Sequence, residues 1–120
     1  MDSKRFLRLG TFLVALGLLS VARATLVGSP VGHVVSISSY AQYGGVPGVG
    51  TDVIFLMEGT TPGCDGFWLS PNDPGYKQTL AVLLMLKATG GQAIAGGYTE
   101  APWPGSSTGN FCRVFGLTAQ

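Results

Sequence analysis

Charged side chains and histidine are scarce in this sequence, and their scarcity limits what the chain can do. Only 11% of the 120 residues are charged, and His33 is the single histidine. A protein metal site needs a close set of Cys, His or carboxylate ligands, which one histidine and two distant cysteines do not supply. We therefore expect no metal and no other cofactor.

Catalytic patterns are also missing. A serine nucleophile would have to use His33 as its base, and none of the candidate serines stands in a nucleophile-elbow sequence: Ser36, Ser38, Ser106 and Ser107. Glu58 and Asp65 flank a turn, where a carboxylate pair is one interpretation and solvated turn charges are the simpler one. We predict that the protein is not an enzyme.

The N-terminus has the three parts of a secretory signal peptide. Lys4, Arg5 and Arg8 precede an apolar run at residues 11–21, and a small-x-small cleavage sequence follows at residues 22–24. The run is shorter than the roughly 20 residues of a membrane span, although an uncleaved anchor is the alternative. We expect residues 1–24 to be the signal peptide, residues 25–120 to form a single OB-like domain, and the protein to be secreted or periplasmic, with no membrane span in the mature chain.

Cleavage would change the charge of the protein. Residues 25–120 keep three basic side chains against five acidic ones, a formal net charge of −2. The remaining cations are scattered along the chain: Lys77, Lys87 and Arg113. Nucleic-acid binding needs clustered cations, so we expect no nucleic-acid partner.

The two cysteines bracket the most regular part of the chain. Cys64 precedes a short aromatic strand and a helix, and Cys112 lies near the C-terminus. A small secreted domain gains stability from a cross-link that restricts the unfolded chain. We predict a Cys64–Cys112 disulfide, with free thiols or an intermolecular bond as the alternatives.

Hydrophobic alternation and turn residues predict β-strands on both sides of one helix. The expected strands cover residues 32–40, 51–58, 66–69, 92–98 and 110–117. A lead-in at residues 25–30 precedes them, and Gly96-Gly97 suggests a bulge in the fourth. Five strands with a helix between strands 3 and 4 favour a β-rich α+β fold, a small oligonucleotide/oligosaccharide-binding (OB)-like barrel. A small antiparallel sheet packed on one helix is the alternative.

The helix is predicted over residues 76–88. Asp73 is a suitable N-cap, Pro74 suits the first helical position, and Gly90-Gly91 suits a C-terminal stop. The helix is apolar almost all round, whereas a surface helix usually keeps a polar face. We therefore predict an oligomer interface at Val82, Met85 and Leu86, and a homo-oligomer that could close into a ring. Burial by long loops of the same chain is the alternative.

One series of segments in the central region is similar to known proteins. The series consists of Cys64, residues 67–69, 70–73, 75–77 and 88–91, and Cys112. It resembles a group of small secreted bacterial single-disulfide OB-like proteins, and its layout is similar to the B subunits of subtilase-cytotoxin and pertussis-like AB5 toxins. That layout implies a pentameric ring that binds glycans.

Binding is the activity that the residues favour. Trp103 lies between two prolines in a loop, and Tyr98, Tyr40 and Tyr43 are expected near it. Exposed aromatic rings beside polar groups suit sugars and protein surfaces, whereas a capping role at one end of the barrel is the alternative for Trp103. We predict a secreted non-catalytic binding module for a glycan or protein ligand. A periplasmic or cell-surface assembly protein, which docks a partner through its apolar helix, is the second hypothesis.

Overall fold

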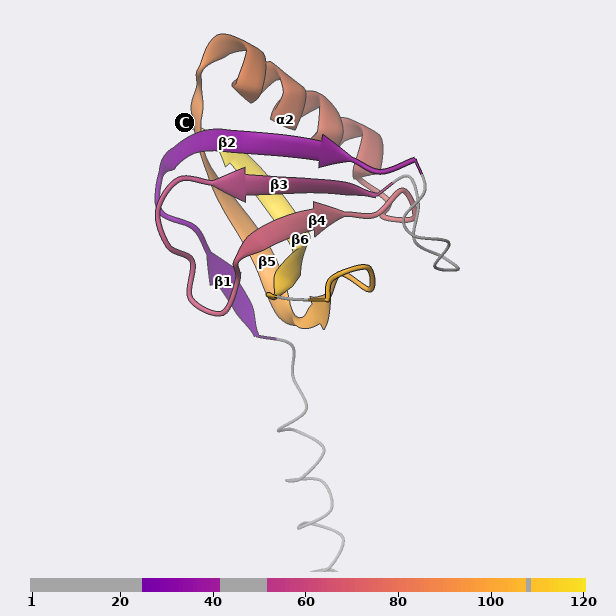
Figure 1. Ribbon diagram of the computed structural model, residues 1–120. Coiled ribbons are helices and arrows are strands. Elements are labelled where there is room, and N and C mark those ends of the chain that lie inside the picture. Colours follow the sequence, from indigo (N-terminus) through magenta and orange to yellow (C-terminus); the bar gives the residue numbers. More distant parts are fainter. Residues whose placement is uncertain (1–24, 42–51, 108) are drawn as a thin grey trace, which may run out of the picture.

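The computed structural model describes residues 25–41, 52–107 and 109–120. The predicted signal peptide and Tyr43 lie outside them. Within the described residues the protein is a β-rich α+β fold with one helix and a six-stranded sheet (Figure 1). Its elements are β1 (Leu26–Gly28), β2 (Gly32–Ser39), β3 (Val53–Met57), β4 (Gly66–Leu69), α2 (Tyr76–Thr89), β5 (Gln92–Pro102) and β6 (Phe111–Ala119).

The prediction of five strands is wrong by one, because the expected lead-in contains β1. Its three residues pair antiparallel with β5, with Leu26 opposite Tyr98. Three residues before a proline are too few to show alternation, so tertiary pairing creates this strand. As a result α2 follows the fourth strand rather than the third.

Five of the six strands are paired with one another in a closed circle. The sheet runs β1-β5-β2-β3-β4-β6, and β5 also pairs with β6. The β4–β6 pair is parallel and the other pairs are antiparallel. Because β5 pairs with both β2 and β6, the strands β2, β3, β4, β6 and β5 form a circle of neighbours.

Two of the three register shifts in the sheet decide which side chains face the core. Val34 pairs with Met57 and Ser36 with Leu56, so Val35 is an extra residue in β2. Its side chain is exposed, and Lys87 Nζ donates a hydrogen bond to its carbonyl at 3.0 Å. The second shift lies at Gly96-Gly97, where a bulge was expected. Gly96 pairs with Gly116 and Gly97 pairs with Val114, so Phe115 is an extra residue in β6. A bulge of this kind changes the direction of the following side chains.

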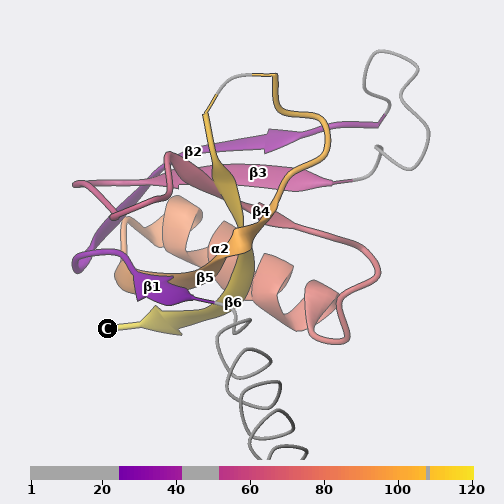
Figure 2. The same cartoon turned by 90° about the horizontal axis from the view of Figure 1, so that it is seen from below.

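The core lies between the strands and α2. Phe55 and Phe67 are fully buried and stacked, with ring centroids 5.4 Å apart. A Cβ at Gly97 would lie 3.0 Å from the Phe67 ring, so only glycine lets β5 pass this close. The helix contacts β2 and β6, and Figure 2 shows it between the β2–β3 and β5–β6 pairs.

The helix begins differently from the prediction. Its N-cap is Gly75, and no side chain caps it. The Asp73 carboxylate instead accepts hydrogen bonds from Ser70 N and from Arg113. The C-terminus is as predicted, because Gly90 adopts φ +71° and Gly91 N donates to Leu86 O at 3.1 Å. None of the described helices is both long and apolar enough to cross a membrane.

The predicted disulfide is present. Cys64 and Cys112 are bonded, and their Cα atoms lie 5.6 Å apart. Both side chains are buried. Since Cys112 stands opposite Phe67 in the parallel β4–β6 pair, the bond fastens the segment before β4 to β6.

Candidate functional site

Trp103 lies in a buried aromatic cluster rather than on an exposed loop. It is 5% exposed and packs with Ile54, Trp68, Tyr40 and Phe111. Its indole N–H donates to Asp52 Oδ2 at 2.9 Å, which satisfies a carboxylate that is itself 3% exposed. The burial disagrees with the expectation of an exposed ring and agrees with the alternative of a cap. Direct ligand binding by Trp103 stays a prediction.

The predicted tyrosines do not share one site. Tyr40 packs on Trp103, with ring centroids 5.3 Å apart. Tyr98 lies elsewhere, on β5, where its ring is perpendicular to that of Phe115 at 5.7 Å. Phe115 is 62% exposed. The expected aromatic surface is therefore divided into a buried Trp103 cluster and a Tyr98–Phe115 pair, in which Tyr98 is half-buried and Phe115 is exposed.

The Tyr98–Phe115 pair borders a cleft between β5, β6 and the turn before α2. We call it the β5–β6 cleft; its volume is about 220 Å³. Leu69 and Val114 contribute apolar side chains to its lining. The lining also contains aromatic and polar side chains: Asp73, Thr79, Tyr98, Arg113 and Phe115.

Arg113 is held in a fixed position at this cleft. Its Nε donates to Asp73 Oδ1 at 2.9 Å, and its Nη2 donates to the same oxygen. Its guanidinium carbon lies 5.4 Å from the centroid of the Trp68 ring, a cation–π contact. Because the guanidinium carries five N–H donors, donors remain beside the Asp73 carboxylate for a ligand.

The sequence contained a partial signal for this site. Alternation places Arg113 and Phe115 on the side of β6 opposite Cys112, as observed. The same alternation places Leu117 with them, which is wrong, because Leu117 packs against the core. The extra residue at Phe115 reverses the side on which the rest of β6 is buried.

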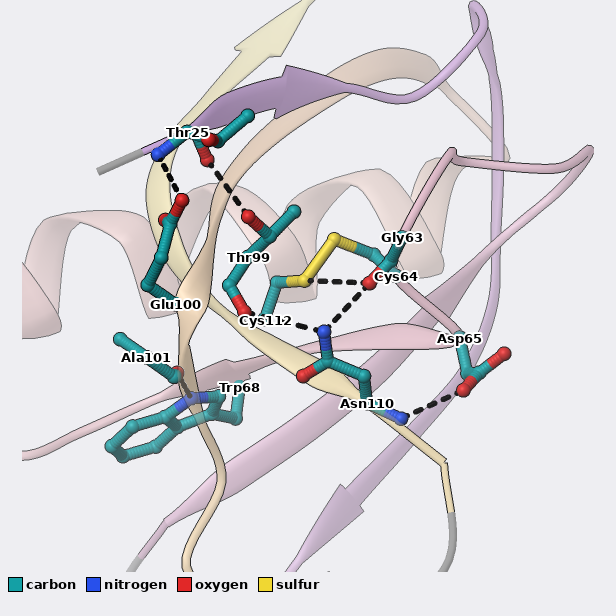
Figure 3. Close-up of a disulfide and its surroundings, with 10 residues drawn as sticks. All are labelled: Thr25, Gly63, Cys64, Asp65, Trp68, Thr99, Glu100, Ala101, Asn110 and Cys112. Atoms are coloured by element: carbon teal, nitrogen blue, oxygen red, sulfur yellow. Dashed lines mark hydrogen bonds between the residues drawn. A yellow bond between two sulfur atoms is a disulfide. The ribbon is translucent and has the colours of Figure 1, made fainter. Parts of the chain in front are cut away.

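A second cavity lies in the β3–β4 loop beside the disulfide. It has a volume of about 570 Å³ and is lined by residues 59–67 with Met57 and Asn110. Asn110 Nδ2 donates to Gly63 O at 2.7 Å and to Thr99 O at 3.3 Å, and its backbone N–H donates to Asp65 Oδ2 at 2.7 Å (Figure 3). The side chain thus ties the loop to β5, and these bonds assign Asp65 a structural role.

Asn110 Oδ1 is buried and accepts no hydrogen bond within the described residues. An orphaned buried acceptor costs about 1–3 kcal/mol. The two bonds donated by the amide nitrogen fix the orientation of the group and leave the oxygen on the other side. Cys112 Sγ also lies 3.5 Å from Gly63 O, a contact without a proton because the sulfur is in a disulfide.

Glu58, the other expected partner in a carboxylate pair, contacts His33 instead. Its Oε1 accepts a hydrogen bond from the His33 backbone N–H at 2.5 Å and also contacts the imidazole Nδ1. These bonds to the ionised carboxylate lower the pKa of Glu58. Both side chains are about half exposed. Among the described residues, no group of three or more His, Cys, Asp and Glu side chains is placed to hold a metal ion.

The three predicted interface residues of the helix have different surroundings. Leu86 is 3% exposed and belongs to the core, which agrees with the alternative of burial within the same chain, and its place in an oligomer interface stays a prediction. Val82 is partly buried against the same core. Met85 is 50% exposed, and its neighbour Leu84 is 52% exposed. The turn of 100° per residue places Leu83 and Leu86 inward, and therefore Leu84 and Met85 outward.

Comparison with protein-family models, with curated proteins and with solved structures finds no match for this chain. The resemblance to the toxin B subunits therefore stays a prediction.

Proposed function

We propose that the chain is a secreted, non-catalytic binding module that recognises a glycan through the β5–β6 cleft. The observation that carries the proposal is the exposed Phe115 ring, perpendicular to Tyr98 and next to the Arg113–Asp73 pair. Aromatic rings pack against the apolar faces of sugars. Sugar hydroxyls both donate and accept hydrogen bonds, which matches a guanidinium beside a carboxylate.

The size of the cleft limits the ligand. Pockets that enclose drug-sized ligands measure about 300–1,000 Å³, and this cleft measures about 220 Å³. One sugar ring, at the end of a chain or within it, suits such a space. Arg113 is already paired with Asp73, so the site has no excess positive charge that would select a strongly anionic ligand.

The fold and the cysteines agree with this proposal. The circular order of β2, β3, β4, β6 and β5 matches an OB-type barrel, a fold that binds oligosaccharides and oligonucleotides. Residues 25–120 contain only three cations, too few to bind a nucleic-acid backbone, so an oligosaccharide is the favoured ligand. A disulfide is typical of secreted and periplasmic proteins.

Replacing either aromatic ring of the Tyr98–Phe115 pair is expected to weaken glycan binding strongly. On a glycan array, we expect Phe115→Ala and Tyr98→Ala each to weaken the bound signal at least ten-fold. Phe115→Ala should leave the melting temperature nearly unchanged, because exposed substitutions cost little stability. Val31→Ala is the matched control, since Val31 is 51% exposed and does not line the cleft. Absence of any glycan ligand, or equal binding by Phe115→Ala and Val31→Ala, would contradict the proposal.

Docking of a partner through the helix is the second candidate. It is favoured by the adjacent exposed side chains of Leu84 and Met85 on an element whose other side is buried. A second copy of the chain is the simplest partner. We expect light scattering to show an oligomer that Met85→Lys dissociates and that Val31→Lys, at an equally exposed position outside the helix, does not. A wild-type monomer would exclude self-association through this surface.

A further inference from the structure

Thr25, the first described residue, is held by two consecutive residues of β5. Its backbone N–H donates to Glu100 Oε1 at 2.5 Å. Its carbonyl accepts hydrogen bonds from Thr99 N at 3.1 Å and from Thr99 Oγ1 at 3.4 Å (Figure 3). The sequence separation of 75 residues between Thr25 and Glu100 makes this a tertiary contact, and a carboxylate directed at a backbone nitrogen is its central feature.

The nitrogen in this contact is the atom that signal-peptide cleavage would release. The small-x-small sequence at residues 22–24 predicts cleavage after Ala24, and the structure independently places a carboxylate on Thr25 N. We propose that the Ala24–Thr25 peptide bond is the processing site of the chain, and that Glu100 binds the ammonium group that its hydrolysis creates. The inference rests on the proposed secretion and is independent of the proposed ligand.

The chemistry of the step is simple hydrolysis. The bond between the Ala24 carbonyl carbon and Thr25 N breaks, and one water supplies hydroxyl to the carbonyl carbon and a proton to the nitrogen. The amine takes a second proton from solvent, because an α-amino group has a pKa of about 7.7–8.0. A neutral N–H donor thus becomes a cation beside the Glu100 carboxylate, and a charge-assisted bond replaces an ordinary one.

Glu100 is suited to this role before cleavage. Hydrogen bonds from Thr25, first from its side chain and then from its backbone N–H, lower the pKa of Glu100, and burial opposes this only in part. Two of the three cations of residues 25–120 are engaged elsewhere, Arg113 with Asp73 and Lys87 with the Val35 carbonyl.

The ion pair would fix the strand beside the proposed binding site. Thr25 immediately precedes β1, and Leu26 stands opposite Tyr98 in the β1–β5 pair. Since β1 has three residues, a stronger bond at its start adds to the few contacts that hold it. Processing would therefore strengthen the attachment of β1 next to the Tyr98–Phe115 pair.

The test begins with the precursor, expressed with its own N-terminus in a secreting bacterial host. Intact mass and N-terminal sequencing of the secreted protein should give Thr25 as the first residue; any other N-terminus overturns the processing site. Amide hydrogen exchange at Thr99, whose N–H donates to Thr25 O, then reports the attachment of Thr25. We expect Glu100→Gln to speed this exchange about two- to five-fold, the range of an exposed ion pair.

Selective acetylation of the Thr25 α-amine removes its positive charge but leaves an N–H donor. It therefore separates the effect of the charge from that of the hydrogen bond to Glu100. The α-amine is modified before lysine near neutral pH because its pKa is lower. In the acetylated protein, Glu100→Gln should change Thr99 exchange less than 1.5-fold. Glu58→Gln, which removes a carboxylate that binds His33, is the matched control and should have no effect at Thr99. Equal effects of Glu100→Gln in the free and acetylated proteins, or no effect in either, would overturn the role of Glu100, even where the N-terminus is Thr25.

Discussion

Removing the Cys64–Cys112 disulfide is expected to lower the free energy of unfolding by about 4 kcal/mol. The two cysteines are 48 residues apart, and closing a loop of that length restricts the unfolded chain by roughly this amount. For a domain of this size, such a loss lowers the melting temperature by roughly 15–30 °C. Thermal and urea unfolding of the Cys64→Ala/Cys112→Ala protein should measure it.

Reduction of the wild-type protein is the matched control for this prediction. The reduced protein keeps both sulfur atoms, so its loss of stability isolates the cross-link. The double alanine variant loses the cross-link and also the packing of two buried side chains. We expect reductant to destabilise the wild type strongly and to leave the variant unchanged. A reduced wild type that melts within a few degrees of the oxidised protein would contradict the prediction.

The position of the disulfide explains why its effect should be large. The β4–β6 pair is parallel and has three residue pairs, from Gly66–Phe111 to Trp68–Arg113. A parallel pair needs a long connection, here through α2 and β5, so its closure costs much chain entropy. The disulfide joins the segment just before β4 to β6, next to the pairing that closes the circle of strands.

Much of the fold could be predicted because its signals are local. Alternation identified the strands β2 to β6, glycine ended the helix at Gly90, and two cysteines allowed one intramolecular pairing. The errors came from long-range contacts. The strand β1 forms only against β5, and the extra residue Val35 reverses the faces of β2, so that Val34 and Ile37 both pack in the core.

The candidate site was harder to predict than the fold. The predicted binding residues include Tyr98 but not its neighbours Phe115 and Arg113. Asp73 has the local sequence of a helix cap, yet it binds Arg113, which lies 40 residues further along the chain. An ion pair of this kind leaves no local pattern. Trp103 was assigned to a loop surface because prolines surround it, and its burial depends on Asp52 and Tyr40 from distant segments.

The second large effect is expected at Trp103. Replacing a buried tryptophan by alanine costs about 3–5 kcal/mol, and Trp103 packs on Tyr40 and Phe111. Trp103→Ala also removes the donor to Asp52, whose side chain would stay buried without that hydrogen bond. We therefore expect Trp103→Ala to lower the free energy of unfolding by at least about 3 kcal/mol in urea. Loss of glycan binding in this variant would then report unfolding rather than a missing ligand contact.

Trp103→Phe and Asp52→Asn separate the packing of the ring from its hydrogen bond. Trp103→Phe keeps an aromatic ring but removes the donor, whereas Asp52→Asn keeps an acceptor for the indole N–H. The double variant should be less destabilised than the sum of the two single variants, because both act on the same hydrogen bond: Trp103→Phe removes its donor and Asp52→Asn removes the charge of its acceptor. If Trp103→Ala instead unfolds within 1 kcal/mol of the wild type and loses glycan binding, the ring is not a structural cap, and Trp103 would replace the Tyr98–Phe115 pair as the binding surface.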